Sequence, residues 1–156
     1  MKLQKEAQGN LGRYIEDVTH NRTIVGGMQY LVLTRPEIAF SVHKLSQYVS
    51  APTLQHLMAC KRVLRYLKAT HDYGLKFIKH GDLKLTCFTD ADWAEDLDDR
   101  KSVGAYCIYL GYNIISWSSK KEPVIARSSA ESEYRSLAST SAEINWLQSL
   151  FSELRL

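Results

Sequence analysis

The sequence is poor in cysteine and has no long apolar run. Its three cysteines, Cys60, Cys87 and Cys107, lie far apart, form no CxxC pair and sit among apolar residues. We therefore expect buried thiols in a reducing compartment, and neither disulfides nor zinc ligands. No apolar run approaches the roughly 18–20 residues that cross a bilayer, and the polar start does not resemble a signal peptide. These features predict an intracellular chain, of the cytoplasm or the nucleus.

An excess of charge of one sign is also missing. The 20 basic and 17 acidic side chains leave a net charge of +3, which neither demands nor excludes a nucleic-acid partner. The five histidines are scattered, and no His/Cys spacing suits a metal. A chain of 156 residues with 45% hydrophobic residues can bury one fair core or two small ones.

The first half of the chain predicts helices. We expect residues 1–22 to be a loosely ordered entry segment and residues 23–80 to form a helical block. The pattern Thr34-x-x-Glu37 is typical of a capping box, and Pro36 suits a first helical turn. Behind it, one apolar stripe recurs at helical spacing: Ile38, Val42, Leu45 and Val49.

A second helix is predicted from Thr53 to about residue 69, after the stop signal of Pro52. At 100° per residue its apolar arc contains Leu57, Cys60, Leu64 and Leu67, and its neighbouring arc contains Lys61, Arg62, Arg65 and Lys68. Two interpretations of the basic arc stay open. It is either a solvated face beside the core or a surface that binds nucleic-acid phosphates.

The second half of the chain changes to the period of strands. We predict a short strand at 74–78 and stronger strands at 83–92, 103–110 and 114–120, with a hairpin turn at 111–113. A long helix is predicted over 129–154. The chain as a whole is therefore expected to be α+β, with a helical block followed by three antiparallel strands and a long helix.

The long helix places one acid among apolar residues. On a helical wheel five residues fall within roughly 40° of Glu133: Leu137, Thr140, Ile144, Leu147 and Phe151. We therefore expect Glu133 on the face that packs on the sheet. A carboxylate there is costly unless it pairs with a basic residue, lies at the rim of the packed face, or holds a metal ion. Glu131 points away from that face, and Ser128-x-x-Glu131 predicts a capping box.

An acidic cluster follows the strand at 83–92. Six acids in ten residues repel one another unless solvent or cations separate them: Asp90, Asp92, Glu95, Asp96, Asp98 and Asp99. We expect the last four in a solvated loop, partly balanced by Arg100 and Lys101. An EF-hand calcium loop that starts at Asp90 is excluded, because its sixth position would hold Glu95 in place of glycine and its twelfth would hold Lys101 in place of glutamate. A strand aspartate, Asp90 or Asp92, facing Glu133 would suit Mg²⁺.

Three stretches resemble a known family. TDADWAEDLDDRKS and YLGYNIISWSSKKEPVIARSSAESEYRSLA are similar to the ribonuclease H region of copia-type LTR retrotransposon polyproteins. The preceding IVGGMQYLVLTRPEIAFSVHKLSQYVSAPTLQHLMACKRVLRYLKATHDYGLKF resembles the reverse-transcriptase end and connection of the same polyproteins. The resemblance implies a partial ribonuclease H-like domain over 81–156 and a reverse-transcriptase end over 23–80.

The resemblance also implies site residues. It makes Asp90, the first acid of TDAD, and Glu133, the second glutamate of SSAESEY, ligands for Mg²⁺ or Mn²⁺ in a hydrolase that cuts the RNA strand of an RNA–DNA hybrid. The family's third catalytic aspartate follows the long helix and has no counterpart in these 156 residues. We therefore favour a chain that is catalytically silent by itself, a truncated remnant that keeps only nucleic-acid or protein binding. The family also pairs further strands with the strand at 83–92, whose unpaired edge predicts self-association.

Overall fold

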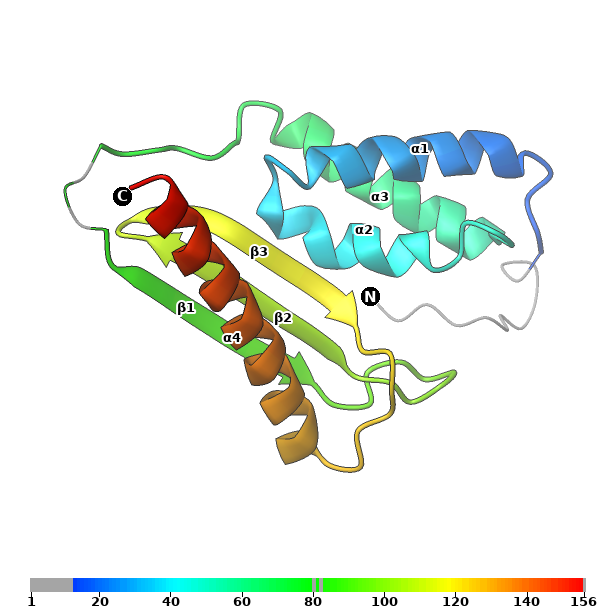
Figure 1. Cartoon of the computed structure of the whole chain (residues 1–156). Helices are drawn as coiled ribbons and strands as arrows, with labels where there is room; N and C mark the ends of the chain where they lie inside the picture. The colour runs from blue at the N-terminus through cyan, green and yellow to red at the C-terminus, as the bar shows by residue number, and fades with distance from the viewer. Residues whose placement is uncertain (1–12, 80, 82, 156) are drawn as a thin grey trace. The chain divides into compact units, whose positions relative to one another are not determined.

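The computed structural model describes residues 13–79, 81 and 83–155 (Figure 1). It divides into two compact units, Met1–Leu75 and Lys76–Leu156, a few residues before the boundary that we placed at 80/81. The first unit is helical and the second combines a sheet with one helix, so the α+β class is confirmed. Within the described residues, no helix has the length and apolar character needed to span a membrane.

The helical unit contains α1 (Val18–Leu31), the 3-10 turn η2 (Pro36–Ile38), α2 (Ala39–Ser46) and α3 (Leu54–Ala69). The predicted stripe of the second helical segment is confirmed: Ile38, Val42 and Leu45 are at most 3% exposed, and Val49 packs against them. Around these side chains the three helices close one apolar core, which also contains Val25, Met28, Tyr48, Ala59, Cys60 and Val63.

The start of α1 corrects the predicted entry segment. Residues 1–12 lie outside the described part of the chain, but residues 18–22 are already helical. The carboxylate of Asp17 accepts a hydrogen bond from the His20 amide at 2.8 Å and so caps the helix. Asn21 is buried and accepts a hydrogen bond from the Cys60 thiol. The polar residues before position 23 thus include the capped start of a helix that buries one face.

The capping box predicted at Thr34 is wrong. The Thr34 hydroxyl donates to the carbonyl of Leu31, and the following turn starts without a side-chain cap. Its acid, Glu37, instead accepts from the guanidinium of the buried Arg35 at 2.6 Å. Arg35 also donates to the Thr70 carbonyl at 2.9 Å, and thus ties the start of this segment to the end of α3.

Helix α3 begins at the predicted cap. The side chain of Thr53 caps the helix, and His56 Nδ1 accepts from the Thr53 amide at 2.9 Å, so the two residues form a reciprocal capping box. The predicted apolar arc is confirmed in part, because Cys60 is buried and Leu67 packs against the core. The buried stripe runs through His56, Ala59, Cys60 and Val63, whereas Leu64 is 39% exposed. The helix is turned so that small side chains meet α1 and α2.

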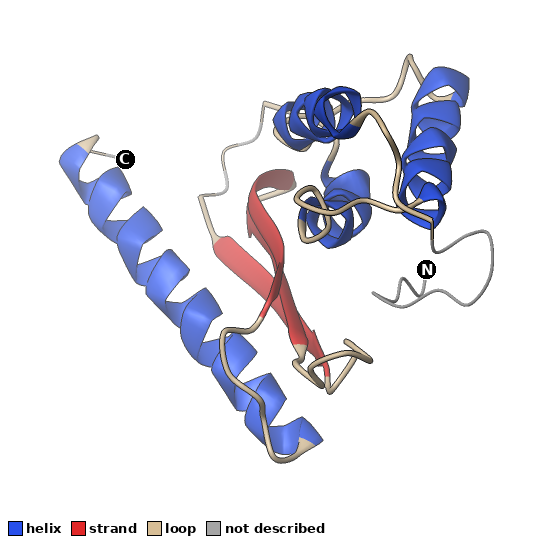
Figure 2. Ribbon diagram, turned by 90° about the vertical axis from the view of Figure 1, so that its right-hand side faces the viewer, coloured by secondary structure: helices blue, strands red, loops and turns tan. Residues whose placement is uncertain are grey.

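The second unit is an antiparallel sheet in the order β1-β2-β3, with α4 across one face (Figures 1 and 2). Its elements are β1 (Leu85–Asp92), β2 (Val103–Leu110), β3 (Asn113–Lys121) and α4 (Ser129–Glu153). The hairpin between β2 and β3 is confirmed, and Gly111 has the positive φ of 57° that such a turn favours.

The short strand predicted at residues 74–78 does not form. The segment is irregular, and Ile78 finds its hydrogen bonds elsewhere: its amide donates to Asn113 Oδ1 at 2.7 Å, and its carbonyl accepts from Asn113 Nδ2 at 2.9 Å. One side chain thus satisfies the backbone groups for which we expected a strand partner.

Candidate metal and nucleic-acid sites

Asp90 lies near the end of β1, the end strand of the sheet. Its carboxylate accepts a hydrogen bond from the Ala91 amide at 2.9 Å, and the side chain is exposed. Asp92, two residues on, is exposed as well. Burial therefore does not separate the two aspartates, and the contacts of α4 decide which one lies near Glu133.

Helix α4 is positioned against β1 by hydroxyl groups. The Ser136 hydroxyl donates to the carbonyl of Asp90 at 2.9 Å and lies 2.8 Å from the Thr89 hydroxyl. The Thr140 hydroxyl lies 3.1 Å from the same Thr89 oxygen. These contacts fix the position of α4 along β1, so that the helical turn containing Glu133 lies beside Asp90.

Gly104 on β2 permits this close approach. A Cβ atom at Gly104 would lie 3.2 Å from Ser136 Oγ and 2.8 Å from Glu122 Oε1. Either contact is tighter than an ordinary van der Waals contact, so a larger residue would push α4 or Glu122 away. The glycine is therefore needed for its small size.

Glu133 is exposed, which corrects the prediction that it lies on the packed face. The buried positions of α4 are Ser132, Ser136, Thr140 and Leu147, so small hydroxyl side chains occupy the centre of that face. Thr140 and Leu147 were predicted on that face and are buried there, whereas Leu137, predicted on the same face, is 47% exposed. Glu133 thus lies at the rim of the packed face, which is one of the three positions that we considered for it.

Asp90 and Glu133 line one pocket of about 400 Å³. Thr89 and Asp90 form its strand side, and the first turns of α4 form its helix side with Ala130, Glu133, Tyr134 and Leu137. Sequence reasoning missed Thr89 and Tyr134, although Thr89 directly precedes the aspartate and Tyr134 directly follows the glutamate. Two acids 43 positions apart in the chain are thereby brought to one place.

The donor set of this pocket suits a hard cation in kind. Two exposed carboxylates offer the oxygen ligands that Mg²⁺ and Mn²⁺ prefer, and Mg²⁺ is often held by one or two carboxylates together with water and substrate phosphates. Among the described residues, no group of three or more His, Cys, Asp or Glu side chains is placed to hold a metal ion. The two acids therefore fit a cation that is shared with phosphate.

Glu131 has the structural role that we predicted, with a changed partner. The Ser128 hydroxyl accepts from the Glu131 amide at 3.2 Å, as in a capping box. The Glu131 carboxylate accepts from the amide of Arg127 at 2.8 Å and pairs with Arg135 one turn on. The Arg127 amide and the Arg135 guanidinium hold the pKa of Glu131 below its ordinary value.

The acidic loop after β1 is more ordered than predicted. Asp96 is only 2% exposed, which contradicts a solvated position, and its carboxylate accepts from the Lys121 ammonium at 2.7 Å. Lys121 also lies 2.9 Å from the carboxylate of Asp99. Burial raises the pKa of Asp99, but hydrogen bonds from Lys121 and the Lys101 amide outweigh it, and the net pKa lies below its ordinary value. A strand lysine, missed by sequence reasoning, thus organises the loop.

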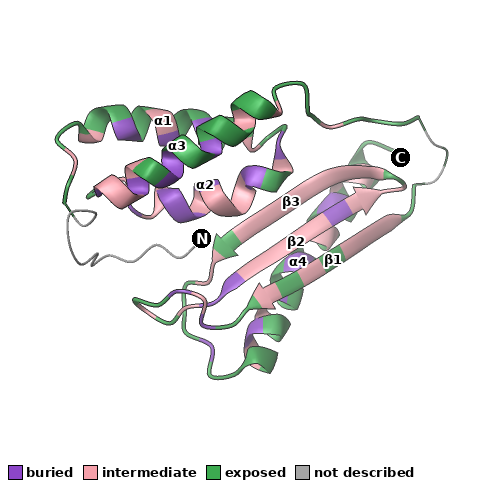
Figure 3. Cartoon of the chain, turned by 180° about the vertical axis from the view of Figure 1, so that it is seen from behind, coloured by how far each residue is buried: buried purple, intermediate pink, exposed green. Residues whose placement is uncertain are grey.

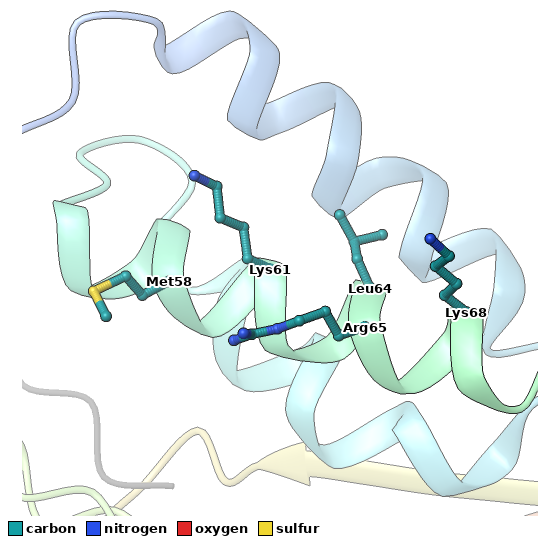
Figure 4. Close-up of a pocket in the computed structure, with 5 residues that line it drawn as sticks. All are labelled: Met58, Lys61, Leu64, Arg65 and Lys68. Atoms are coloured by element: carbon teal, nitrogen blue, oxygen red, sulfur yellow. The ribbon is translucent and has the colours of Figure 1, made fainter.

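The basic arc of α3 divides between two surfaces. Lys61, Arg65 and Lys68 line a pocket of about 510 Å³ with Met58 and Leu64, and all five side chains project from successive turns of the helix (Figure 4). We call these five residues the α3 groove. Arg62 lines a different pocket, with Glu37 and Tyr66. Three of the four predicted cations therefore share one surface, and the exposed Met58 gives it an apolar part that the charge pattern did not reveal.

The three cysteines are free, as predicted, but only Cys60 is buried. Cys87 and Cys107 are half-buried in the sheet. Burial raises the pKa of Cys60 and of Cys107, which favours the neutral thiol at both positions.

Similarity searches relate the chain to transposon proteins. It is 50% identical to the retrovirus-related Pol polyproteins from transposons RE1 and RE2 of Arabidopsis thaliana, over 92% of this chain and 10% of each polyprotein. It is also 46% identical to secreted RxLR effector protein 161 of Plasmopara viticola, over 79% of this chain and 87% of that protein.

The chain thus spans about a tenth of the length of the polyproteins that it matches. No family model matches it, and no solved structure matches it significantly. The identity to the polyproteins extends over nearly all of the chain and includes both units. The chain belongs to the family of copia-type retrotransposon Pol polyproteins.

Proposed function

We propose that the chain is a ribonuclease H-like piece of a retrotransposon polyprotein, with Asp90 and Glu133 as the acids that act on the RNA strand of an RNA–DNA hybrid. The observation that carries this proposal is the single pocket that both carboxylates line. The membership of the chain in the copia-type family supports it, because the same two acids stand in the motifs that resemble the ribonuclease H region.

In this proposal the two carboxylates would hold Mg²⁺ or Mn²⁺ at the phosphate to be cut. A divalent cation, when bound, lowers the pKa of water and stabilises charge on phosphate oxygens. Asp90 is supported by the Ala91 amide, which orients its carboxylate. Ser136 and Thr140 hold α4 against β1 through hydrogen bonds to the Asp90 carbonyl and the Thr89 hydroxyl, and so keep Glu133 level with Asp90 along the strand.

Cleavage of a labelled RNA–DNA hybrid by the purified chain with Mg²⁺ or Mn²⁺ tests this function. Because the family's third catalytic aspartate has no counterpart in these residues, we expect at most weak cation-dependent cleavage, and we expect Asp90→Asn and Glu133→Gln each to abolish it. The Asp92→Asn variant is the matched control, because it removes an exposed carboxylate from the same strand. Cleavage that survives Asp90→Asn would reject the proposed site.

A second candidate is binding without cleavage, which the α3 groove favours. Three cations on successive turns, with no acid among the residues that line the groove, suit the phosphates of a nucleic acid. We expect hybrid binding whose salt dependence flattens when Lys61, Arg65 and Lys68 are changed to glutamine. The matched control is Arg62→Gln, which removes the cation that lies outside the groove. Hybrid bound normally but left uncut by the wild-type chain would favour this candidate.

A further inference from the structure

A second pocket of the helical unit is lined by residues to which neither proposed function assigns a ligand. Its volume is about 330 Å³, near the small end of the range for ligand pockets, which is about 300–1,000 Å³. Both walls come from the packing of this one unit, with α3 on one side and η2 and the start of α2 on the other. We call it the Tyr66 pocket, and its lining residues are Arg62, Val63 and Tyr66 on α3 and Glu37, Ile38 and Ser41 on the opposite wall.

The charged groups of the Tyr66 pocket do not pair with each other. The Arg62 guanidinium makes no hydrogen bond or ion pair with any residue that the structure describes. Glu37 accepts from Arg35 through Oε1 alone, so its second carboxylate oxygen has no donor among the described residues. A ligand in the pocket therefore meets a cation on one wall and a carboxylate oxygen on the other, and both can bond it.

A buried arginine holds two of the lining residues in place. Arg35, which is 6% exposed, donates to Glu37 at 2.6 Å, and its guanidinium lies over the Tyr66 ring, 5.8 Å from the ring centroid. Bonds to the carbonyl and the hydroxyl of Thr70 fix Arg35 in turn. The carboxylate and the aromatic ring are thus positioned before a ligand arrives, which lowers the entropy cost of binding.

The chemistry of the pocket suits a nucleobase. Ile38 and Val63 are buried and provide apolar contact area, and the partly exposed Tyr66 ring offers a face on which a base can stack. Arg62 can donate to two neighbouring acceptors, and Glu37 can accept from an amino group on the opposite side. Among the four bases, guanine alone combines two adjacent acceptors, N7 and O6, with an amino donor on its opposite edge.

The Tyr66 pocket and the α3 groove lie on adjacent arcs of one helix, most of which is exposed beyond position 60 (Figure 3). At 100° per residue, Arg62 is about 60° from Arg65 around the helix axis. We propose that the Tyr66 pocket binds one unpaired guanine of a nucleic-acid strand whose phosphates lie on the α3 groove.

The strand part of this proposal rests on the nucleic-acid binding proposed above, whereas the guanine site can be tested by itself. A fully paired hybrid presents no unstacked base, so Arg62→Gln remains a valid control for hybrid binding at the groove.

Titration of the full chain with guanosine monophosphate, followed by NMR, tests the pocket alone. We expect saturable shifts of the Ser41, Val63 and Tyr66 amide signals, and about tenfold weaker binding of adenosine monophosphate. Glu37→Gln should remove this difference, because its oxygen can keep the bond to Arg35 while its NH₂ group meets the amino group of guanine. Equal affinities for the two nucleotides, or a preference that survives Glu37→Gln, would overturn the proposal.

The control variant is Glu16→Gln, which makes the same chemical change at an exposed position outside the pocket. It should bind both nucleotides as the unmodified chain does. A loss of the guanine preference in Glu16→Gln as well would contradict the assignment to Glu37.

A strand assay tests whether the pocket and the groove bind one ligand. A short oligouridylate with one central guanosine should bind about tenfold more tightly than the same strand with one central adenosine. Changing Lys61, Arg65 and Lys68 together to glutamine should weaken both strands and keep their ratio, whereas Glu37→Gln should remove the ratio. Strands that bind without a guanine preference would overturn the proposal. Strands that fail to bind while the monophosphate result holds would reject nucleic-acid binding at the groove, and with it the strand as the source of the guanine.

Discussion

Both units of this chain bury apolar and polar side chains, but they differ in what fills the main contact between their elements. The helical unit closes nine buried side chains, all apolar or aromatic, into one cluster. In the second unit the centre of the helix–sheet contact is polar: Ser132, Ser136 and Thr140 are buried on α4 and meet the strands through hydroxyl groups. Apolar packing tolerates small rotations of a helix, whereas hydrogen bonds hold one register. The polar contact is the one that sets Glu133 beside Asp90.

The largest effect is expected from the buried ion pair of the second unit. Lys121→Ala removes the ammonium group that bonds the Asp96 carboxylate, which is only 2% exposed. Breaking a buried pair in this way typically costs about 3–5 kcal/mol. Urea unfolding followed by tryptophan fluorescence suits the test, because Trp93, Trp117 and Trp146 all lie in this unit. The exposed Lys120→Ala is the matched control, and equal stabilities of the two variants would contradict the account.

A similar loss is expected in the core of the helical unit. Leu45 is 1% exposed at the centre of the apolar cluster, so Leu45→Ala should cost about 2–5 kcal/mol through lost burial and the cavity that it leaves. The same substitution at Leu64, which is 39% exposed on α3, should cost much less. Urea unfolding followed by circular dichroism at a helix band measures both. Equal losses would mean that the buried stripe of α3 is assigned wrongly.

A smaller effect is expected where α4 meets the sheet. Ser136→Ala removes the hydrogen bond to the Asp90 carbonyl and the contact with Thr89, and should cost about 1 kcal/mol because a partly buried acceptor loses one donor. Ser139→Ala, at an exposed position of the same helix, is the control. A Ser136→Ala variant as stable as this control would show that the hydroxyl contacts do not hold the helix.

The smallest effect is a pH dependence in the helical unit. Burial lowers the pKa of His56, whose Nδ1 atom accepts from the Thr53 amide. The unfolded chain, with a histidine pKa near 6.5, therefore takes up a proton before the folded chain does. Stability from the neutral ring is present above pH 6.5 and is lost as the pH falls from there through the lower folded-state pKa.

The His56→Gln variant isolates this contribution, since glutamine at the same helix position can accept the same bond without titrating. Unfolding free energies from pH 8 to pH 5 should fall less steeply in the variant than in the wild-type chain. Parallel pH profiles would remove the assigned role of His56.

Local patterns were enough to predict much of the fold. The stripe of Ile38, Val42 and Leu45, the cap at Thr53 and the turn at Gly111 each depend on residues close in the chain, and each was predicted from the sequence. The strand predicted at 74–78 failed because the side chain of Asn113, 35 positions after Ile78, bonds the backbone there.

In the candidate site, too, contacts between residues far apart in the chain were not predictable from the sequence. The motifs singled out Asp90 and Glu133, but the helical wheel centred the packed face on Glu133, whereas the buried residues of α4 lie to one side of it. Gly104 lets α4 approach so closely that small hydroxyl residues fill the contact, and this turns Glu133 to the rim. Asp96 was assigned to solvent because its partner, Lys121, lies on another strand.

Binding of Mn²⁺ followed by NMR tests the shared role of Asp90 and Glu133 most directly, without relying on cleavage. A bound paramagnetic ion should broaden the amide signals of Thr89, Ala130 and Tyr134, which line the pocket. The account predicts that Asp90→Asn and Glu133→Gln each remove this broadening. Broadening confined to the acidic loop at residues 94–101, or unchanged by either substitution, would contradict it.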